Sequence, residues 1–528
     1  MAWRLMWTAA CLITLQLGYI ASRAAQSDQP PIVKVQGALL EGTHFGSTPN
    51  QAAFLGVPYA APPIGDLRWK PPQLAAKWSG TRKADNYGPP CPQLPASWFP
   101  YIEGNEDCLY LNVWTTDLRS NANHPVLVYF HGGSNTQGYS QMIPLGSPLS
   151  QMGLVVVSTN YRLGPFGFFA HPALTAESQY HSSGNYGLLD QLQALRWVKE
   201  NIRQFGGDPD RITVMGQSAG AVDICLLLAS PMSQGLFQRA ILESGECQDT
   251  LNEDIRTPIK YNLIDTTGEA SGVRLARDLG VPDGPDALEK LRQIPTNEIL
   301  KAWKNDPELH FDAIVDGSVI PKQPAQIFAE GKQLLVPILV GSNADEATVF
   351  GHNHLRTVGD YKKHLQQDSG QYWEEEFQLY PANSDSEAPI RSMRLTSDEF
   401  ACGAYSLAQA MTKAGEKSYL YYFTYVNPGK RSRLGAHHGE ELFFLSDSFP
   451  ADWEHTTEDN YLDGLLRGYW TAFVKTGDPN FDSAPKWPTF DSNPEGYFEI
   501  GAQVGLHPVS ERIRNLDKIM RRVTAKQN

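Results

Sequence analysis

One serine stands in a sequence context that suits nucleophilic chemistry. Ser218 lies within Gly216-Gln217-Ser218-Ala219-Gly220, directly after a short apolar run at 211–215 and before a helical pattern at 221–229. In such a strand–turn–helix arrangement the turn lifts the serine Oγ off the sheet, and the flanking glycines remove side chains that would clash. The N-terminus of the following helix directs backbone N–H groups at developing negative charge. The pattern therefore predicts that Ser218 is the nucleophile of an acyl transfer.

A serine nucleophile needs a base, and the base needs an acid to orient it. In sites of this kind the acid and then the histidine follow the serine along the chain. Asp345 and Glu346 lie in a loop after the apolar run 336–340, and His437 and His438 lie farther on in a glycine-flanked loop. Their order and their places in loops make these four residues the candidates for acid and base.

A third requirement is a set of donors for the oxyanion of the tetrahedral intermediate. After the apolar run 126–130 the chain reads His131-Gly132-Gly133-Ser134, which places backbone N–H groups at the end of an earlier strand. Together with the N–H of Ala219 they can meet the oxyanion, and one such donor is typically worth about 10²–10³ in rate. The sequence thus supplies nucleophile, base with acid, and oxyanion donors in separate loops.

The loops that carry these residues follow short runs of strand-like composition. Most of the runs are continuously apolar, as in strands buried on both faces of a parallel sheet. They lie at 126–130, 154–158, 211–215, 239–243, 336–340 and 419–423. Between two of them, residues 190–205 carry apolar side chains at a helical period. The alternation predicts an α/β fold with a mostly parallel sheet flanked by helices, and the helix-rich stretch 250–332 is expected to form a cap over the carboxyl edge.

Several longer motifs resemble the type-B carboxylesterases, the cholinesterase-like branch of the α/β-hydrolases. They are long and specific, and they extend from Gln36 to Gly501, nearly the whole mature chain. The motifs include Phe54-Leu-Gly-Val-Pro-Tyr59, Glu106-Asp-Cys-Leu-Tyr-Leu-Asn112, Asn160-Tyr-Arg162-Leu-Gly, Gly184-Asn-Tyr-Gly-Leu-Leu-Asp190-Gln, Phe205-Gly-Gly-Asp-Pro209 and Lys475-Thr-Gly-Asp-Pro479. The resemblance implies an α/β-hydrolase fold with large helical cap insertions, and hydrolysis of carboxylic esters.

The same resemblance chooses among the candidates. It implies Ser218 as nucleophile, His438 as general base and Glu346 as the acid, with His437 and Asp345 as the alternatives. The further positions that match the family are the oxyanion donors Gly133, Ser134 and Ala219, the disulfide Cys91–Cys108, and the structural ion pairs Arg68–Glu106 and Arg162–Asp190. The base must be neutral to accept the serine proton, so activity is expected to fall as the pH drops through about 6–7.

Three positions depart from the family pattern. Ser134 replaces a usual glycine, so its side chain must point away from the oxyanion hole or the hole is narrower. Gln217 replaces the usual glutamate beside the nucleophile, which removes a negative charge there. Trp98 lies ten residues before Cys108, where cholinesterases place a cation-binding tryptophan, but the neighbouring glutamate is missing. The last two departures make a choline ester a weak option as substrate.

The N-terminus predicts export. Residues 1–25 contain Arg4, an apolar stretch at 5–20 and small residues before Gln26, which are the three parts of a secretory signal peptide. Residues 26–528 then form a single α/β-hydrolase domain in a secreted or periplasmic protein, in which disulfides can form. Of the remaining cysteines, Cys225 is expected to pack as a small apolar group, and a Cys247–Cys402 pair is possible.

Composition excludes several other classes. With 44 Lys and Arg against 58 Asp and Glu, the net charge of −14 argues against nucleic acid and against anionic membranes as partners. No membrane anchor, cofactor or metal is expected, and the expected partner is a small-molecule ester. The sequence leaves open the physiological ester and the oligomeric state. The alternatives are a catalytically silent, cholinesterase-like binding or adhesion protein, and the same triad acting on amides or lactones.

Overall fold

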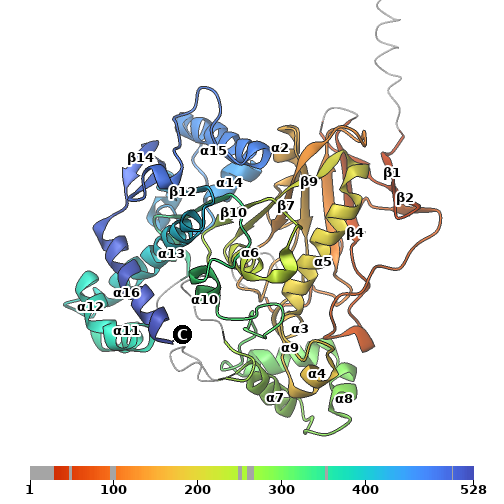
Figure 1. Ribbon diagram of the computed structural model, residues 1–528, viewed down its shortest axis with the longest axis horizontal. Coiled ribbons are helices and arrows are strands. Elements are labelled where there is room, and N and C mark those ends of the chain that lie inside the picture. The colour runs from red at the N-terminus through yellow and green to blue at the C-terminus, as the bar shows by residue number, and fades with distance from the viewer. Residues whose placement is uncertain are drawn as a thin grey trace, which may run out of the picture.

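An eleven-stranded sheet forms the centre of the computed structural model (Figure 1). The structure describes residues 29–46, 50–95, 103–247, 253–257, 267–350, 355–501 and 503–527. The expected signal peptide, residues 1–25, and Trp98 lie outside the described residues.

The large sheet is parallel in its middle and antiparallel at both ends. Its strand order is β14-β13-β12-β11-β10-β9-β7-β8-β6-β4-β3, and the pairs between β13 and β8 are parallel. A separate small sheet has the order β1-β2-β5. The strands are β1 Ile32–Val35, β2 Ala38–Glu41, β3 Thr43–His44, β4 Ala52–Pro58, β5 Thr81–Lys83, β6 Tyr110–Thr115, β7 His124–Phe130, β8 Val155–Thr159, β9 Gly207–Gln217, β10 Arg239–Glu243, β11 Ile338–Asn343, β12 Ser418–Phe423, β13 Gly496–Ile500 and β14 Gly505–Pro508.

The continuous apolar runs arise because the central strands are buried on both faces. In β7, Leu127 and Tyr129 point into one hydrophobic core, whereas Val128 and Phe130 point into the other. Alternate residues of a strand face opposite sides, so a sheet covered on both sides needs apolar residues at every position. The fold class expected from the sequence is confirmed.

Helices cover the two faces of this sheet as separate layers. Side chains of α5, α6, α10 and α13 pack into the larger core, and those of α14 and α15 into the smaller one, together with Leu149 of α2. The helices are α2 Gly146–Gln151, α3 Gly164–Gly167, α4 Pro172–Glu177, α5 Tyr186–Asn201, α6 Ala219–Ala229, α7 Gly268–Asp278, α8 Ala287–Gln293, α9 Thr296–Asn305, α10 Pro324–Ala329, α11 Val358–Asp368, α12 Trp373–Leu379, α13 Ala388–Lys413, α14 Glu441–Ser446, α15 Thr457–Thr476 and α16 Glu511–Gln527.

The stretch expected to form a cap is helical where the structure describes it. Helix α7 packs against α9, while α9 packs against α3 and α8 against α4, the short helices that follow the carboxyl end of β8 (Figure 1). Helix α10, at the end of the same stretch, instead packs against α6 and α13 on the face of the sheet. The cap is therefore an insertion built on loops at the carboxyl edge.

Two disulfides close short loops of the chain. One joins Cys91 and Cys108, the pair that the family resemblance implied. The other joins Cys225 of α6 to Cys247 after β10, while Cys402 of α13 is buried and takes part in neither of these disulfides. The expectation that Cys225 packs as an apolar thiol, and the possible Cys247–Cys402 pair, are therefore wrong. The apolar sequence around Cys225 reflects a helix that is buried along its whole length, and the disulfide lies inside that buried layer.

Two buried ion pairs fix the loops near the carboxyl edge. Arg162 binds Asp190 in a bidentate arrangement, with both N···O distances at 2.7 Å, and both side chains are almost completely buried. Burial raises the pKa of Asp190, which Arg162 opposes. Arg68 binds Glu106 in the same way at 2.7 and 2.5 Å. Both pairs are those implied by the family resemblance.

We expect Arg162→Met to lower the free energy of unfolding by about 3–5 kcal/mol, because the Asp190 carboxylate would stay buried without its partner. Urea denaturation of the variant and the parent measures this loss. Arg162→Met combined with Asp190→Asn should recover much of it, since the unpaired charge is then removed. The exposed pair Arg119–Asp117 supplies the control, because Arg119→Met should change little. Equal losses for both arginines would contradict the prediction.

Candidate active site

Ser218 occupies a strained turn between strand β9 and helix α6. Its φ and ψ are 57° and −129°, a conformation that side chains rarely adopt and that raises the Oγ above the sheet. The turn needs glycine on both sides: a Cβ on Gly216 would lie 2.4 Å from Gly220, and one on Gly220 would lie 2.2 Å from the Phe130 carbonyl oxygen. The backbone N–H of Ser218 donates to the carbonyl of Glu243 at 2.8 Å, which ties the turn to β10.

His438 and Glu346 lie in direct contact, although 92 residues separate them. The Nδ1 of His438 is 2.5 Å from Oε2 of Glu346, a residue with no exposed surface at the start of the 3₁₀ helix Glu346–Val349. The other carboxylate oxygen accepts hydrogen bonds from Ser244 Oγ and from the Asn343 N–H, both at 2.6 Å. A proton on Nδ1 is therefore shared with the carboxylate, and Nε2 is left as the basic nitrogen of a neutral imidazole.

Asp345 and His437, the alternative acid and base, do not contact each other in the structure. Asp345 Oδ2 accepts the N–H of Ala436 at 3.1 Å and holds the histidine loop from outside. The ring of His437 is buried, with Nδ1 3.0 Å from the carbonyl oxygen of His438 and Nε2 3.2 Å from Arg431. Burial lowers the pKa of His437, which favours the neutral form of its ring.

The loop with the expected oxyanion donors runs beside the nucleophile. A Cβ on Gly132 would lie 3.0 Å from the Cβ of Ser218, so only glycine allows this approach. Gly133 and Ser134 follow with φ of 114° and 54°. The side chain of Ser134 is exposed, and within the described chain no backbone hydrogen bond uses the N–H of Gly133, Ser134 or Ala219. All three donors are thus available to a substrate.

The amide of Gln217 reaches the basic nitrogen of His438. Its Nε2 lies 2.9 Å from His438 Nε2, and the side chain is 5% exposed. Among the described residues, no hydrogen bond joins this nitrogen to Ser218 Oγ. Catalytic hydrogen bonds often form only when substrate binds, so a structure without this bond is compatible with proton transfer. Gln217 stands out in the sequence as a departure from the family pattern, but its contact with His438 is not predictable from the sequence.

Two aromatic rings flank the imidazole of His438. The ring centroids of Phe350 and Phe400 lie 4.9 and 5.3 Å from that of His438, and the two phenyl rings stack on each other at 6.1 Å. Phe350 is partly exposed and gives this side of the site an apolar wall. Sequence reasoning missed both residues. Phe350 closely follows Glu346 in the sequence, and this proximity could have predicted that it lies near the site. Nothing in the sequence around Phe400 on α13 connects that residue to the site.

Two further buried acids lie behind Glu346. Asn343 Nδ2 donates to Glu441, and Trp470 Nε1 donates to Glu243 at 2.7 Å. Burial, together with the negative charge of Glu346, raises the pKa of Glu441 to about 7. Burial and Glu441 likewise raise the pKa of Glu243. Burial thus favours the protonated forms of Glu441 and Glu243.

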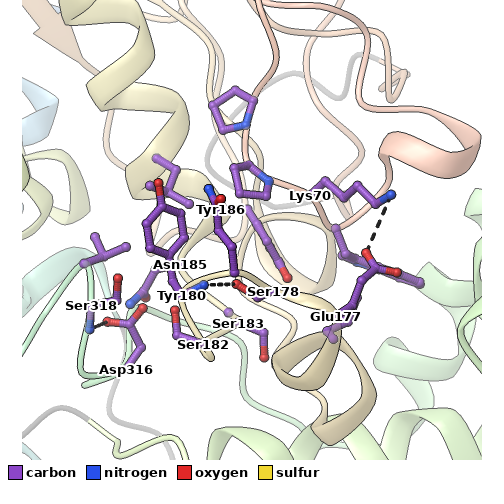
Figure 2. Close-up of a pocket in the computed structure, with 18 of the residues that line it drawn as sticks. Lys70, Glu177, Ser178, Tyr180, Ser182, Ser183, Asn185, Tyr186, Asp316 and Ser318 are labelled. Carbon is purple, nitrogen blue, oxygen red and sulfur yellow. Dashed lines mark hydrogen bonds and ion pairs between the residues drawn. The ribbon is translucent and has the colours of Figure 1, made fainter.

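A separate surface cavity of about 490 Å³ lies away from these residues (Figure 2). It is lined by residues from three segments, 69–73, 174–196 and 316–319, with Met232, and by none of the expected site residues. Several of its polar groups bind one another: Lys70 faces Glu177 at 3.6 Å, and the Ser318 N–H donates to Asp316 at 3.1 Å. We therefore place the candidate active site at Ser218, on chemical grounds, and not in this cavity.

In the part of the chain that the structure describes, no group of three or more His, Cys, Asp or Glu side chains is placed to hold a metal ion. Across the same residues, every helix is too short or too polar to span a bilayer.

The chain is similar over most of its length to known esterases. A family model described as the carboxylesterase family matches residues 29–517. The fumonisin B1 esterase of Sphingopyxis macrogoltabida is 36% identical over 503 residues, which cover 91% of this chain and 88% of that protein. Human neuroligin-2 is 31% identical over 536 residues, which cover 85% of this chain but only 62% of that protein. A solved structure of a PNB esterase has a TM-score of 0.78 and 30% identity, with 93% of this chain and 99% of that chain covered. The chain therefore belongs to the carboxylesterase family and is a carboxylic-ester hydrolase with the α/β-hydrolase fold.

Proposed function

We propose that this hydrolase works through an acyl-enzyme on Ser218, with His438 as general base and Glu346 as the acid that orients it. The observation that carries the proposal is the 2.5 Å contact between His438 Nδ1 and the buried Glu346 carboxylate. This contact leaves Nε2, the opposite ring nitrogen, as the basic atom. Nε2 lies on the side of the ring that contacts Gln217, the residue directly before Ser218.

The reaction follows from these positions. Ser218 Oγ attacks the ester carbonyl carbon while its proton passes to His438 Nε2, and the N–H groups of Gly133, Ser134 and Ala219 receive the oxyanion. The C–O bond then breaks, and His438 returns the proton to the departing alcohol. Water repeats the sequence on the acyl-enzyme and releases the acid. Glu346 remains charged throughout, since it accepts hydrogen bonds from Ser244 and Asn343 as well as from the imidazole.

The surroundings of His438 favour an ester with an apolar portion. The rings of Phe350 and Phe400 form an apolar wall beside the imidazole. One relative is named for its action on fumonisin B1, so fumonisin B1 belongs in the substrate panel with p-nitrophenyl esters of increasing acyl length. The rank order of kcat/KM over this panel defines the acyl preference.

The proposal includes export and a single hydrolase domain. Residues 1–25 have the composition of a signal peptide, and two disulfides suit an oxidising compartment. Residues 26–528 then form one domain, because the described helices between β10 and β11 pack onto the same sheet and its loops.

We expect a fluorophosphonate probe to label the protein at Ser218 and p-nitrophenyl acetate to be hydrolysed, because the serine is activated and faces free oxyanion donors. Ser218→Ala should abolish labelling and lower kcat by at least about 10³-fold. Intact-mass spectrometry and a spectrophotometric assay measure the two effects.

The same experiment separates the enzyme from the silent binding protein that the neuroligin-2 similarity suggests. Absence of both labelling and turnover in the folded parent protein would contradict the esterase mechanism. Turnover of p-nitrophenyl anilides or lactones at rates above those of esters would identify the amide or lactone alternative.

We expect Glu346→Gln to lower kcat by about 10³–10⁴-fold, because a neutral amide can no longer fix the proton on Nδ1 or stabilise the imidazolium. Asp345→Asn is the matched control: it lies one residue away, makes no contact with the His438 ring, and should retain most of the activity. Steady-state kinetics of both variants test the assignment, and a larger loss for Asp345→Asn would reverse it.

A further inference from the structure

The basic nitrogen of His438 is contacted by an amide and not by a carboxylate. Gln217 Nε2 lies 2.9 Å from His438 Nε2, while Glu346 binds the opposite nitrogen. Because Nδ1 carries the proton shared with Glu346, Nε2 of the neutral ring is an acceptor, and the amide N–H₂ of Gln217 is a suitable donor to it. The imidazole is therefore held at both nitrogens.

The Gln217 side chain is fixed in this position by two glycine loops. A Cβ on Gly132 would lie 3.0 Å from Gln217 Oε1, and one on Gly439 would lie 3.5 Å from Nε2. Gly439 follows His438 and has a φ of 75°, so both histidine and amide are placed by the same turn. An amide enclosed in this way has little freedom to leave the histidine.

We propose that Gln217 is a positioning residue for His438: its amide donates to the neutral imidazole, and by stabilising that form it keeps the base active at lower pH than a carboxylate in its place would allow. The inference rests on the proposed role of His438. A hydrogen bond to the neutral form of a base disfavours the charged form, whereas a carboxylate at the same distance would favour the imidazolium.

During the reaction the hydrogen bond from the Gln217 amide to Nε2 is replaced by a hydrogen bond from the Ser218 hydroxyl. The serine hydroxyl donates to Nε2 as Oγ attacks, the proton moves to Nε2, and it then goes to the leaving alcohol. The amide neither gains nor loses a proton. It acts before the attack, when it donates to the Nε2 lone pair, and it then gives up this lone pair to the serine hydroxyl.

Other charged groups lie in the segments around His438, and they are the same in the parent protein and in variants at residue 217. Glu346 and Asp345 lie on the acid loop, Glu441 on α14, His437 and Arg431 on the histidine loop, and Glu399 next to Phe400 on α13. None of them contacts Nε2 within the described residues. A change confined to residue 217 therefore reports on the contact at Nε2.

The test is the pH dependence of kcat/KM for the full-length protein and two variants, Gln217→Glu and Gln217→Leu. The parent should have the lowest midpoint on the acid limb. Gln217→Glu should raise that midpoint by at least about one pH unit, which lowers kcat/KM about tenfold on the acid limb. Gln217→Leu removes the donor without adding charge, so its midpoint should lie between the two, with kcat lower by about fivefold. Gln179→Glu, an exposed change of equal charge, is the control and should leave the profile unchanged.

A second measurement does not depend on turnover. The far-downfield proton NMR resonance of the Nδ1 proton shared with Glu346 follows the titration of the imidazole. Measured in Ser218→Ala backgrounds, its midpoint should be lowest with Gln217 unchanged, intermediate with Gln217→Leu and highest with Gln217→Glu. Superimposable midpoints for Gln217→Glu and the parent would overturn the proposal, as would a loss of kcat in Gln217→Leu with no shift of either midpoint. Failure of the parent to hydrolyse esters, with the NMR order intact, would count against the proposed function alone.

Discussion

The proposed site depends on one carboxylate that is completely buried, so that only protein groups can stabilise its charge. Glu346 has no exposed surface, and a buried ion of this kind is costly unless several donors compensate it. Its donors come from three places: Ser244 just after β10, the Asn343 N–H at the end of β11, and His438 in the loop after β12. The carboxylate therefore requires three strand ends to stay in register, and any loosening of the parallel sheet would disturb its contact with His438.

The architecture satisfies this requirement by packing the sheet on both faces. Strands β9 to β12 are neighbours, and their carboxyl ends bring together the serine turn, the Ser244 segment, the acid and the histidine loop. Glycine then permits the close approach of the loops themselves, as at Gly132 beside Ser218. The strained conformation of Ser218 persists because the surrounding strand, helix and backbone hydrogen bond determine it.

The sequence predicted what is local or strongly periodic. The apolar runs gave the central strands to within a few residues, and the long motifs indicated the family and the residues that the structure brings together around His438. Contacts between distant segments were not predictable. Cys225 lies in an apolar helix and is predicted to be a packed thiol, yet it pairs with Cys247, 22 residues farther along the chain and after β10. Phe400 reaches the histidine from the middle of a long helix, and no spacing rule connects them. The Gln217 contact likewise joins the end of β9 to a loop 221 residues farther along the chain.

The two ends of the large sheet have a consequence for the behaviour of the molecule at high concentration. A broad sheet with long, open edges offers unpaired N–H and C=O groups on which another chain can add a strand. Here the edge strands are β3, with two residues, and β14, with four residues that end in Pro508. Short edges and a proline present few free backbone groups in a row. The two edge strands of the large sheet thus offer little room for a strand of another chain, although the sheet is not closed into a barrel.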